Sequence, residues 1–311
     1  MLRITFLGTA SSRPTVKRNV SGLALQRAGN LFLFDCGEGT QRQMMRYGVG
    51  FSVEQIFITH LHADHYLGLP GLFRTMNLQA REAPIVVWGP VGSSGTLRDA
   101  VELGGDRMRF PVSIRELPAG ESVKYDGFVI KAYETDHRAE SVGYVLKEDS
   151  RLGRFDVKKA RSLGVQEGPM FGRLHRGEAV EGAGGRIVSP EEVVGPRRRG
   201  RTVVYTGDTR PSEQTVAEAS EADLLIHEAT FAEEEAARAR ETKHSTAREA
   251  AQMAAKAGVR RLVLTHFSAR YSEQADRLAA EAAEIYPAAE AASDGMTVEV
   301  DFPDPSSGAQ P

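Results

Sequence analysis

Four side chains that can bind a metal ion stand close together after an apolar segment. Residues 55–59 (QIFIT) are short and apolar, which predicts a buried strand, and a turn into a helix is predicted from residue 68 onward. The loop between them contains His60, His62, Asp64 and His65. Imidazole and carboxylate groups suit Zn²⁺, and four of them exceed what one catalytic zinc ion with an open position requires. A single histidine here would usually be structural, but this cluster indicates a site for two metal ions.

Three more apolar segments end in residues of the same kind. They are residues 129–133, followed by Asp136 and His137, residues 202–206, followed by Asp208, and residues 261–265, followed by His266. Loops along one edge of a rigid sheet can bring such residues together. Because five of the eight histidines fall in this scheme, the sequence predicts one site built at four strand ends.

The strand-like segments alternate with helical ones, which is the pattern of an α/β fold. Thr246, followed three residues later by Glu249, predicts a capping box that opens a helix over residues 247–257 and ends it near Gly258. Since the candidate ligands run from residue 60 to residue 266, one domain over residues 1–302 is the simplest division. The Pro, Ser and Gly content of residues 303–311 predicts a disordered tail.

Composition is that of a globular protein, with 41% hydrophobic and 26% charged residues in 311. The one cysteine, Cys36, excludes an intrachain disulfide and fits a reducing compartment. No apolar stretch approaches the ~20 residues of a membrane span, and the first residues are strand-like rather than a signal peptide. We therefore expect a cytoplasmic protein with no membrane partner.

The motif at residues 60–65 has the HxHxDH form that is the hallmark of the metallo-β-lactamase fold superfamily, which the chain resembles. Further segments narrow the resemblance to the short form of the ribonuclease Z family, the tRNA 3′-processing endonucleases. These segments are residues 6–9 (FLGT), 34–41 (FDCGEGTQ), 207–211 (GDTRP), 227–230 (HEAT) and 244–246 (HST). The resemblance runs from residue 2 to about residue 302 and implies a four-layer αβ/βα sandwich with an inserted, flexible exosite arm.

The same resemblance implies two Zn²⁺ ions per subunit and assigns their ligands. One ion would take His60, His62 and His137, the other would take Asp64, His65 and His266, and Asp208 would bridge them. Zinc lowers the pKa of a bound water to about 7, so a bridging hydroxide would be available to attack a phosphodiester. The implied reaction removes the 3′ trailer from precursor tRNA and leaves a 3′-hydroxyl on the tRNA.

The resemblance also implies roles for residues beside the metals. Asp64 would orient or deprotonate the attacking water, and His244 would contact the scissile phosphate or assist the leaving 3′-oxygen. Glu228 and His227 would support the metals or orient His244, and Asp35 would support a zinc ligand from behind. Simpler interpretations stay open: Asp64 as a ligand alone, His244 as a residue that flanks a helix cap, and Asp35 as a turn residue.

Charge is unevenly distributed along a chain whose net charge is −3. Lys147 to Arg201 contains thirteen Lys and Arg against eight Asp and Glu, is rich in glycine and shows little periodicity. This composition predicts a mobile arm over residues 147–200, although a small basic surplus is usually just a solvated surface. Residues 168–174 (GPMFGRL) resemble the family's arm motif, which implies tRNA contacts by Gly168, Pro169, Gly172, Arg173 and Arg176.

A second basic element lies near the amino terminus. Residues 14–19 (PTVKRN) resemble the family loop that borders the active site, which implies that Lys17 and Arg18 meet phosphates beside the cleavage point.

The resemblance further implies a homodimer. Two other functions stay open from the residues alone: a small-molecule phosphodiesterase of the same fold, and a non-catalytic RNA-binding protein with structural zinc.

Overall fold

The computed structural model describes residues 1–104 and 108–303. The chain forms two compact units, one made of Met1–Lys147 with Thr202–Asp301 and the other of Glu148–Arg201 with Phe302 and Pro303. Residues 304–311, most of the predicted tail, lie outside the described residues. No helix in the described part of the chain is both long and apolar enough to cross a bilayer.

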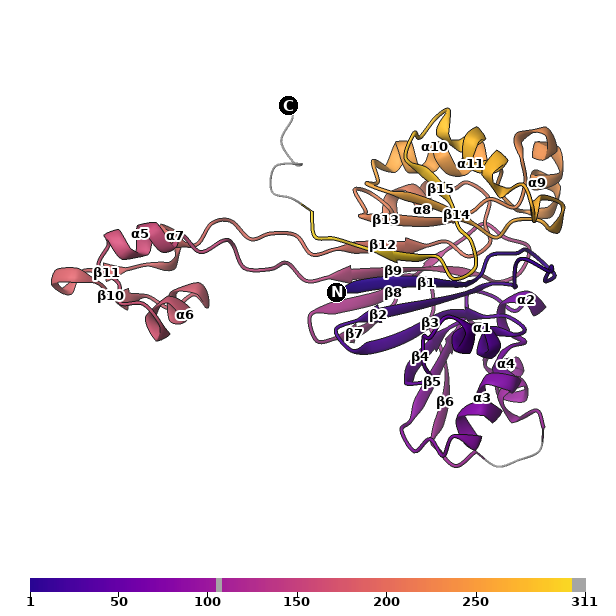
Figure 1. The fold of residues 1–311 in the computed structure, drawn as a ribbon, viewed down its shortest axis with the longest axis horizontal. Coiled ribbons are helices and arrows are strands. Elements are labelled where there is room, and N and C mark those ends of the chain that lie inside the picture. The colour runs from indigo at the N-terminus through magenta and orange to yellow at the C-terminus, as the bar shows by residue number, and fades with distance from the viewer. Residues whose placement is uncertain (105–107, 304–311) are drawn as a thin grey trace. The chain divides into compact units, whose positions relative to one another are not determined.

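The larger unit contains two seven-stranded sheets (Figure 1). The first has the order β16 (Thr297–Glu299), β1 (Leu2–Gly8), β2 (Gly22–Arg27), β3 (Asn30–Cys36), β4 (Val53–Phe57), β5 (Ile85–Gly89) and β6 (Val112–Glu116). The second has the order β15 (Ala289–Ala291), β14 (Leu262–Thr265), β13 (Leu224–Glu228), β12 (Thr202–Tyr205), β9 (Val142–Glu148), β8 (Phe128–Glu134) and β7 (Ser122–Tyr125). The pairs from β3 to β6 and from β12 to β15 are parallel, so these strands send their carboxyl ends to one edge of each sheet.

Alternating apolar residues explain why each sheet is covered on both faces. In β3, Phe32 and Phe34 join a core shared with Tyr144 and Tyr205 of the second sheet, whereas Leu33 belongs to a separate core on the other face. That outer core is covered by α1 (Thr40–Arg46), α3 (Leu69–Leu78) and α4 (Ser94–Glu102), with the short α2 (Ala63–Tyr66) nearby. The predicted four-layer α/β sandwich is confirmed by this arrangement.

On the far side of the second sheet, the helices are α8 (Glu213–Glu218), α9 (Ala236–Thr242), α10 (Ala247–Ala257) and α11 (Ala275–Ala283) (Figure 1). The predicted capping box of α10 is confirmed: Glu249 N–H donates to Thr246 Oγ1, and the Glu249 carboxylate accepts from Thr246 N–H. Gly258 ends the helix with φ +63°, a conformation that glycine adopts at little cost. The buried face of α10 is alanine throughout, so the helix packs closely on the sheet.

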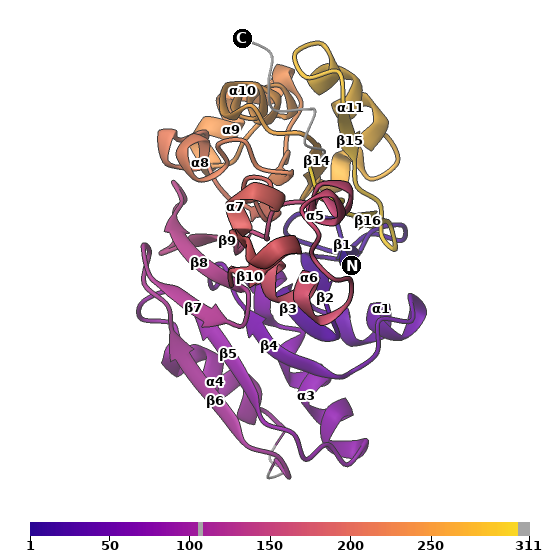
Figure 2. The same ribbon diagram turned by 90° about the vertical axis from the view of Figure 1, so that its left-hand side faces the viewer.

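The smaller unit has its own helices and strands (Figure 2) and its own core of buried side chains. It contains α5 (Val157–Ser162), α6 (Pro169–His175), β10 (Val180–Glu181), a 3₁₀ turn (Ala183–Gly185), β11 (Ile187–Val188) and α7 (Pro190–Val193). The buried side chains that hold these elements together are Ala160, Val165, Leu174, Val180, Val188 and Val193. Glu148 and Arg201 are the first and last residues of the segment that forms most of this unit. They form a buried bidentate ion pair with two contacts of 2.8 Å.

Candidate metal centre

The residues predicted at strand ends converge in the structure. His60 and His62 follow β4, and Asp64 and His65 lie in α2, the first helical turn after that strand. The remaining three follow the carboxyl ends of β8, β12 and β14, and are His137, Asp208 and His266. Because β12 and β14 are neighbours of β13 in one parallel array, their exits lie on the same edge.

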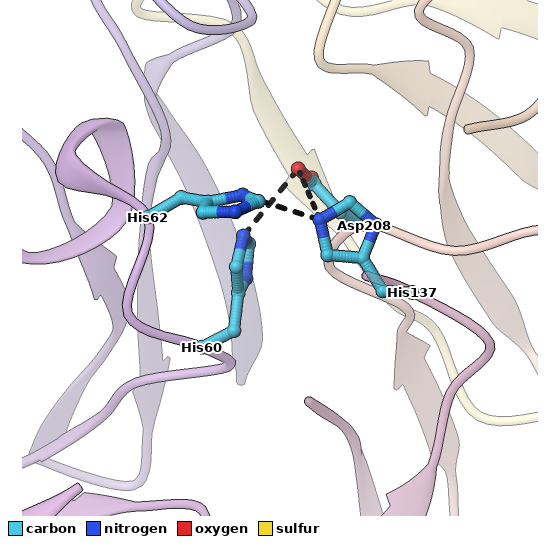
Figure 3. A group of neighbouring side chains, drawn as sticks. All are labelled: His60, His62, His137 and Asp208. Atoms are coloured by element: carbon cyan, nitrogen blue, oxygen red, sulfur yellow. Dashed lines mark hydrogen bonds and ion pairs between the residues drawn. The ribbon is translucent and has the colours of Figure 1, made fainter. Parts of the chain in front are cut away.

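One group of potential ligands consists of three histidines and one aspartate (Figure 3). Their nitrogen and oxygen atoms lie within 4.8 Å of one another, and the residues are His60, His62, His137 and Asp208. Asp208 Oδ2 is 3.6 Å from His60 Nε2 and 4.0 Å from His137 Nε2. The buried His60 Nε2 has no hydrogen-bond partner among the described residues, as expected of an atom placed to bind an ion.

A second group of potential ligands lies beside the other oxygen of Asp208, Oδ1. Asp64 Oδ2 is 3.5 Å from His65 Nε2 and 3.4 Å from His266 Nε2. Asp208 Oδ1 lies 3.4 Å from His65 Nε2 and 3.2 Å from His266 Nε2, and it too has no hydrogen-bond partner in the described part of the chain. One oxygen of Asp208 thus faces each group, which fits two adjacent cations that share this carboxylate.

Hydrogen bonds fix the rings of the four histidines that lie deepest in the site. In each ring Nδ1 has a partner, at 2.8 to 3.0 Å, which leaves Nε2 free to face the centre. The pairs are His60 with Thr59 Oγ1, His65 with Asp35 Oδ2, His137 with the Lys243 carbonyl oxygen, and His266 with Thr230 Oγ1. Such partners set the tautomer and orientation of metal-binding histidines.

Asp35 lies directly behind His65 and is fully buried at φ +58°. Besides His65, its carboxylate accepts hydrogen bonds from Tyr205 Oη at 2.7 Å and from the backbone N–H and hydroxyl of Thr59. Aspartate tolerates the left-handed conformation better than most residues, and here that conformation turns its side chain under the metal loop.

The electrostatics of the centre favour a cation. Burial lowers the pKa of His60 well below its usual value, which keeps this imidazole neutral. Burial acts in the same sense on His65, but the carboxylates of Asp208, Asp35 and Asp64 raise its pKa well above the usual value. Burial would raise the pKa of Asp208, yet the surrounding histidines, His266 and His65 first, hold it well below the usual value. Ionised carboxylates beside imidazoles suit a divalent ion, and binding of the ion would displace the proton that His65 carries without it.

His244 approaches the centre from the turn before α10 and is held by Glu228. His244 Nδ1 donates to Glu228 Oε1 at 2.9 Å, and Asp208 Oδ2 lies 3.9 Å from the same nitrogen. Burial alone would lower the pKa of His244, but the Glu228 carboxylate raises it to about 9. Glu228 is fully buried and also accepts from Thr209 N–H at 2.9 Å and Thr230 Oγ1 at 2.6 Å. This arrangement can supply a proton, or a positive charge, next to the metal groups.

His227 has a different place from its neighbour Glu228. It is fully buried in β13, donates from Nδ1 to the Glu228 carbonyl oxygen at 2.7 Å, and belongs to none of the ligand groups found in the described residues. Burial lowers the pKa of His227, which keeps the ring neutral. Its contact is therefore with the backbone of the HEAT segment rather than with the candidate ligands.

The two basic residues of the amino-terminal loop differ in their surroundings. The Lys17 side chain is 60% exposed and forms a surface ion pair at 3.1 Å with Glu273. The Arg18 guanidinium is partly buried and donates hydrogen bonds within the protein. In the same loop, Ser12 N–H donates to Asp64 Oδ2 at 2.7 Å, so the loop itself reaches the candidate metal centre.

The five predicted arm residues all lie in or beside α6 of the smaller unit. Gly168 precedes the helix with φ +99°, Pro169 occupies its first turn, and Gly172 lies within it. Arg173 is paired with Glu178 at 2.8 Å, and Arg176 follows the helix as an exposed residue. The two arginines therefore put cationic groups on the surface of this unit.

Two functional candidates were missed in the sequence. Thr230 connects three site residues, because its hydroxyl donates to Glu228 and lies 2.9 Å from His266 Nδ1 and 3.3 Å from His244 Nδ1. Arg238 of α9 lines a pocket of about 170 Å³ beside His244, together with Ser11, Ser12, Thr230, Phe231, Thr242, Ser268 and Arg270. The HEAT motif pointed to Thr230 without a role, whereas nothing in the sequence distinguished Arg238 from its neighbour Arg240.

Two family models match parts of the chain. The one described as beta-lactamase superfamily domain matches residues 177–267, and the one described as anti-Pycsar protein Apyc1 matches residues 2–153. Relatives match over the full length: ribonuclease Z of Gemmatimonas aurantiaca is 55% identical over 301 residues, 96% of each chain. Ribonuclease Z of Myxococcus xanthus is 52% identical over 98% of this chain and 99% of its own. Among solved structures, human tRNase Z, short form, superposes with a TM-score of 0.70 at 30% identity, covering 96% of this chain and all of its own.

Proposed function

The chain belongs to the ribonuclease Z family, and from that membership we propose that it cleaves the 3′ trailer from precursor tRNA and leaves a 3′-hydroxyl on the tRNA. The observation that carries the proposal is the Asp208 carboxylate, which faces one histidine group with each oxygen. Such a paired arrangement suits in-line displacement at phosphorus.

The proposed cofactor is zinc, two ions per subunit. His60, His62 and His137 would hold one ion, Asp64, His65 and His266 the other, and Asp208 both. Bound there, the two ions would lower the pKa of a water to about 7 and stabilise the charge that develops on the phosphoryl oxygens. Seven ligands shared by two ions, none of them cysteine, support a catalytic rather than a structural site, since a structural zinc ion usually has four ligands of its own, commonly cysteines.

The chain's own residues would then orient the reaction. Asp64, which accepts the Ser12 N–H, would orient the attacking water and take its proton. His244, with its Nδ1 held by Glu228, would present Nε2–H to the scissile phosphate and give a proton to the leaving 3′-oxygen. Glu228 would keep His244 protonated, and Asp35 would keep His65 oriented.

The substrate would be held mainly through its phosphates. We assign Lys17 to contacts beside the cleavage point and the smaller unit, through α6 with Gly168, Pro169, Gly172, Arg173 and Arg176, to a more distant part of the tRNA. Binding should weaken as salt rises, because phosphate contacts release counterions. We further propose that the protein is cytoplasmic and forms a homodimer. A mass measurement in solution tests the dimer.

One experiment tests the function directly. Purified protein, loaded with zinc, is incubated with a precursor tRNA that carries a 3′ trailer, and both product ends are mapped. The expected products are a tRNA with a 3′-hydroxyl and a trailer with a 5′-phosphate. Intact precursor under conditions in which bis(p-nitrophenyl) phosphate is hydrolysed would replace this function with that of a small-molecule phosphodiesterase.

A further inference from the structure

Arg18 is engaged within the protein, unlike its neighbour Lys17. Its Nη1 donates to Thr9 Oγ1 and to the Ala292 carbonyl oxygen, both at 2.7 Å, and its Nε donates to the Ser272 carbonyl oxygen at 3.1 Å. The guanidinium carbon also lies 5.0 Å from the centre of the Phe267 ring. Three of the five N–H donors of this guanidinium are thus used inside the fold, those of Nε and Nη1.

Asp294 accepts a hydrogen bond from Thr9, the same residue that Arg18 contacts. Its Oδ1 accepts from Thr9 Oγ1 at 2.7 Å, and its Oδ2 accepts from Asn19 N–H at 2.6 Å and from Gln43 Nε2 at 2.9 Å. The Thr9 hydroxyl has one proton, which it gives to Asp294, so it accepts from Arg18. Arg18, Thr9 and Asp294 therefore form a relay that holds both ends of the loop over residues 9–19.

The backbone conformation of this loop determines how it contacts the candidate metal centre. Ser12 adopts φ +63°, a left-handed conformation that costs energy for a residue other than glycine, and points its N–H at Asp64 Oδ2 at 2.7 Å. The next residue back, Ser11, donates its N–H to the carbonyl oxygen of Phe267, which adjoins His266. A loop fixed at both ends can keep this strained donor in place.

We propose that Arg18 and Asp294 are positioning residues of the active site: through the Thr9–Asn19 loop they aim the Ser12 N–H at Asp64. Lys17, one residue away and exposed, keeps the RNA-binding role. The inference deepens the proposed function and rests on it only for the identity of the RNA substrate.

The test compares Arg18→Lys, which keeps the charge but cannot reproduce the three hydrogen bonds, with Lys17→Ala as the matched control. For Arg18→Lys, kcat should fall by about tenfold or more on both precursor tRNA and bis(p-nitrophenyl) phosphate, with KM for tRNA and the salt dependence of tRNA binding unchanged. For Lys17→Ala, KM for tRNA should rise and the slope of log K against log salt should fall by about 1. An Arg18→Lys protein with wild-type kcat on both substrates overturns the proposal.

Two further measurements separate positioning from general loss of structure. Asp294→Asn keeps an oxygen that accepts from Thr9 Oγ1 but loses the oxygen that accepts from Asn19 N–H. Because Asp294 and Arg18 act through the same loop, the fall in kcat in the double variant should be smaller than the product of the two single effects. A chelator should also remove one of the two metal equivalents faster from Arg18→Lys than from Lys17→Ala, a readout independent of any substrate. If Arg18→Lys does not fold, Thr9→Val breaks the same relay with Arg18 in place, and multiplicative effects or equal metal retention would contradict the proposal. If the wild-type protein does not cleave precursor tRNA, the proposed function is wrong. The role of Arg18 would still be decided by hydrolysis of bis(p-nitrophenyl) phosphate and by metal loss to the chelator.

Discussion

At the scale of single residues, Asp208 differs from the other acidic groups because each of its oxygens faces a separate histidine group. In Asp208→Asn an amide nitrogen replaces one of these oxygens, and an amide N–H₂ cannot bind a cation. We expect loss of at least one metal equivalent and a fall in kcat of more than about a hundredfold, since even partners outside the ligand set cost 10–100-fold. Elemental analysis and single-turnover cleavage measure the two effects.

The control for that change is Asp136→Asn. Asp136 lies next to the candidate ligand His137, but its carboxylate pairs with Lys243 at 2.9 Å on the surface. Metal content and cleavage should both stay near the wild-type values, because surface ion pairs contribute little. Equal metal loss in the two variants would show that the loss does not arise from the bridging position of Asp208.

The pair His244 and Glu228 predicts how activity depends on pH. The Glu228 carboxylate raises the pKa of His244 to about 9, so the imidazole carries its proton below that pH and loses it as pH rises further. Activity that needs this proton should therefore decline on the basic side. In Glu228→Gln the raising charge is gone, the pKa of His244 falls, and the basic limb of the kcat profile should move to lower pH.

The measurement is a pH–rate profile of single-turnover cleavage for the wild type, Glu228→Gln and His244→Ala. His244→Ala should lack the basic limb altogether while still binding precursor tRNA. A limb at the same pH in all three proteins would assign the titration to another group.

At the scale of elements, the candidate ligands could be predicted because each follows a strand whose apolar run is visible in the sequence. His137, Asp208 and His266 stand at strand exits, and parallel order brings such exits to one edge. Thr230 could not be given a role in this way, because its partners His244 and His266 come from turns 14 and 36 residues away. The partners of Arg18 were likewise invisible, since Ser272 and Ala292 are fixed by packing of the second half of the chain.

Helix α9 offers a prediction that the sequence alone could not make. Arg238 is exposed, has no ion-pair partner in the described part of the chain, and lines the pocket beside His244. An RNA strand passing that pocket would place a phosphate near this guanidinium. In Arg238→Ala we expect KM for precursor tRNA to rise about threefold or more and the salt slope of binding to fall by about 1, with kcat little changed.

Arg240→Ala is the matched control for this helix. Arg240 is also exposed, lies two residues further along α9 and is not among the residues that line the pocket. Its removal takes away the same charge from the same element, so its tRNA binding should keep the wild-type salt slope. Identical changes in both variants would indicate a general effect of net charge rather than a contact in the pocket.

At the scale of the whole molecule, the glycine-rich stretch contains helices and strands that the sequence did not predict. The prediction of a mobile arm rested on glycine content and little periodicity, and the structure has three helices of four to seven residues and a hairpin around a common core in this stretch. Elements this short contain at most two helical turns, so the apolar positions do not repeat often enough to be recognised. The core residues come from all of these elements, which is why the unit could not be derived from any one of them.

The separate core of the smaller unit permits a clean excision. Arg151 N–H donates to the Arg198 carbonyl oxygen at 2.7 Å, and Arg198 N–H donates back to Arg151 at 2.9 Å, so the two chain segments form an antiparallel pair. Residues 152–197 can be replaced there by Asn-Gly, which favours a two-residue hairpin turn. The buried Glu148–Arg201 ion pair and the contacts of the Phe302 ring with Arg151 and Arg201 are all retained.

If the smaller unit binds tRNA away from the cleavage point, this excision should lower kcat/KM for precursor tRNA by at least about tenfold and leave hydrolysis of bis(p-nitrophenyl) phosphate within about twofold, because only the larger substrate uses remote binding energy. Arg173→Glu with Arg176→Glu, in the intact chain, should reproduce part of the loss on tRNA alone and tests charge without removing the unit. Equal losses on both substrates would mean that the excision damages the metal centre, and unchanged tRNA cleavage would remove the smaller unit from substrate binding.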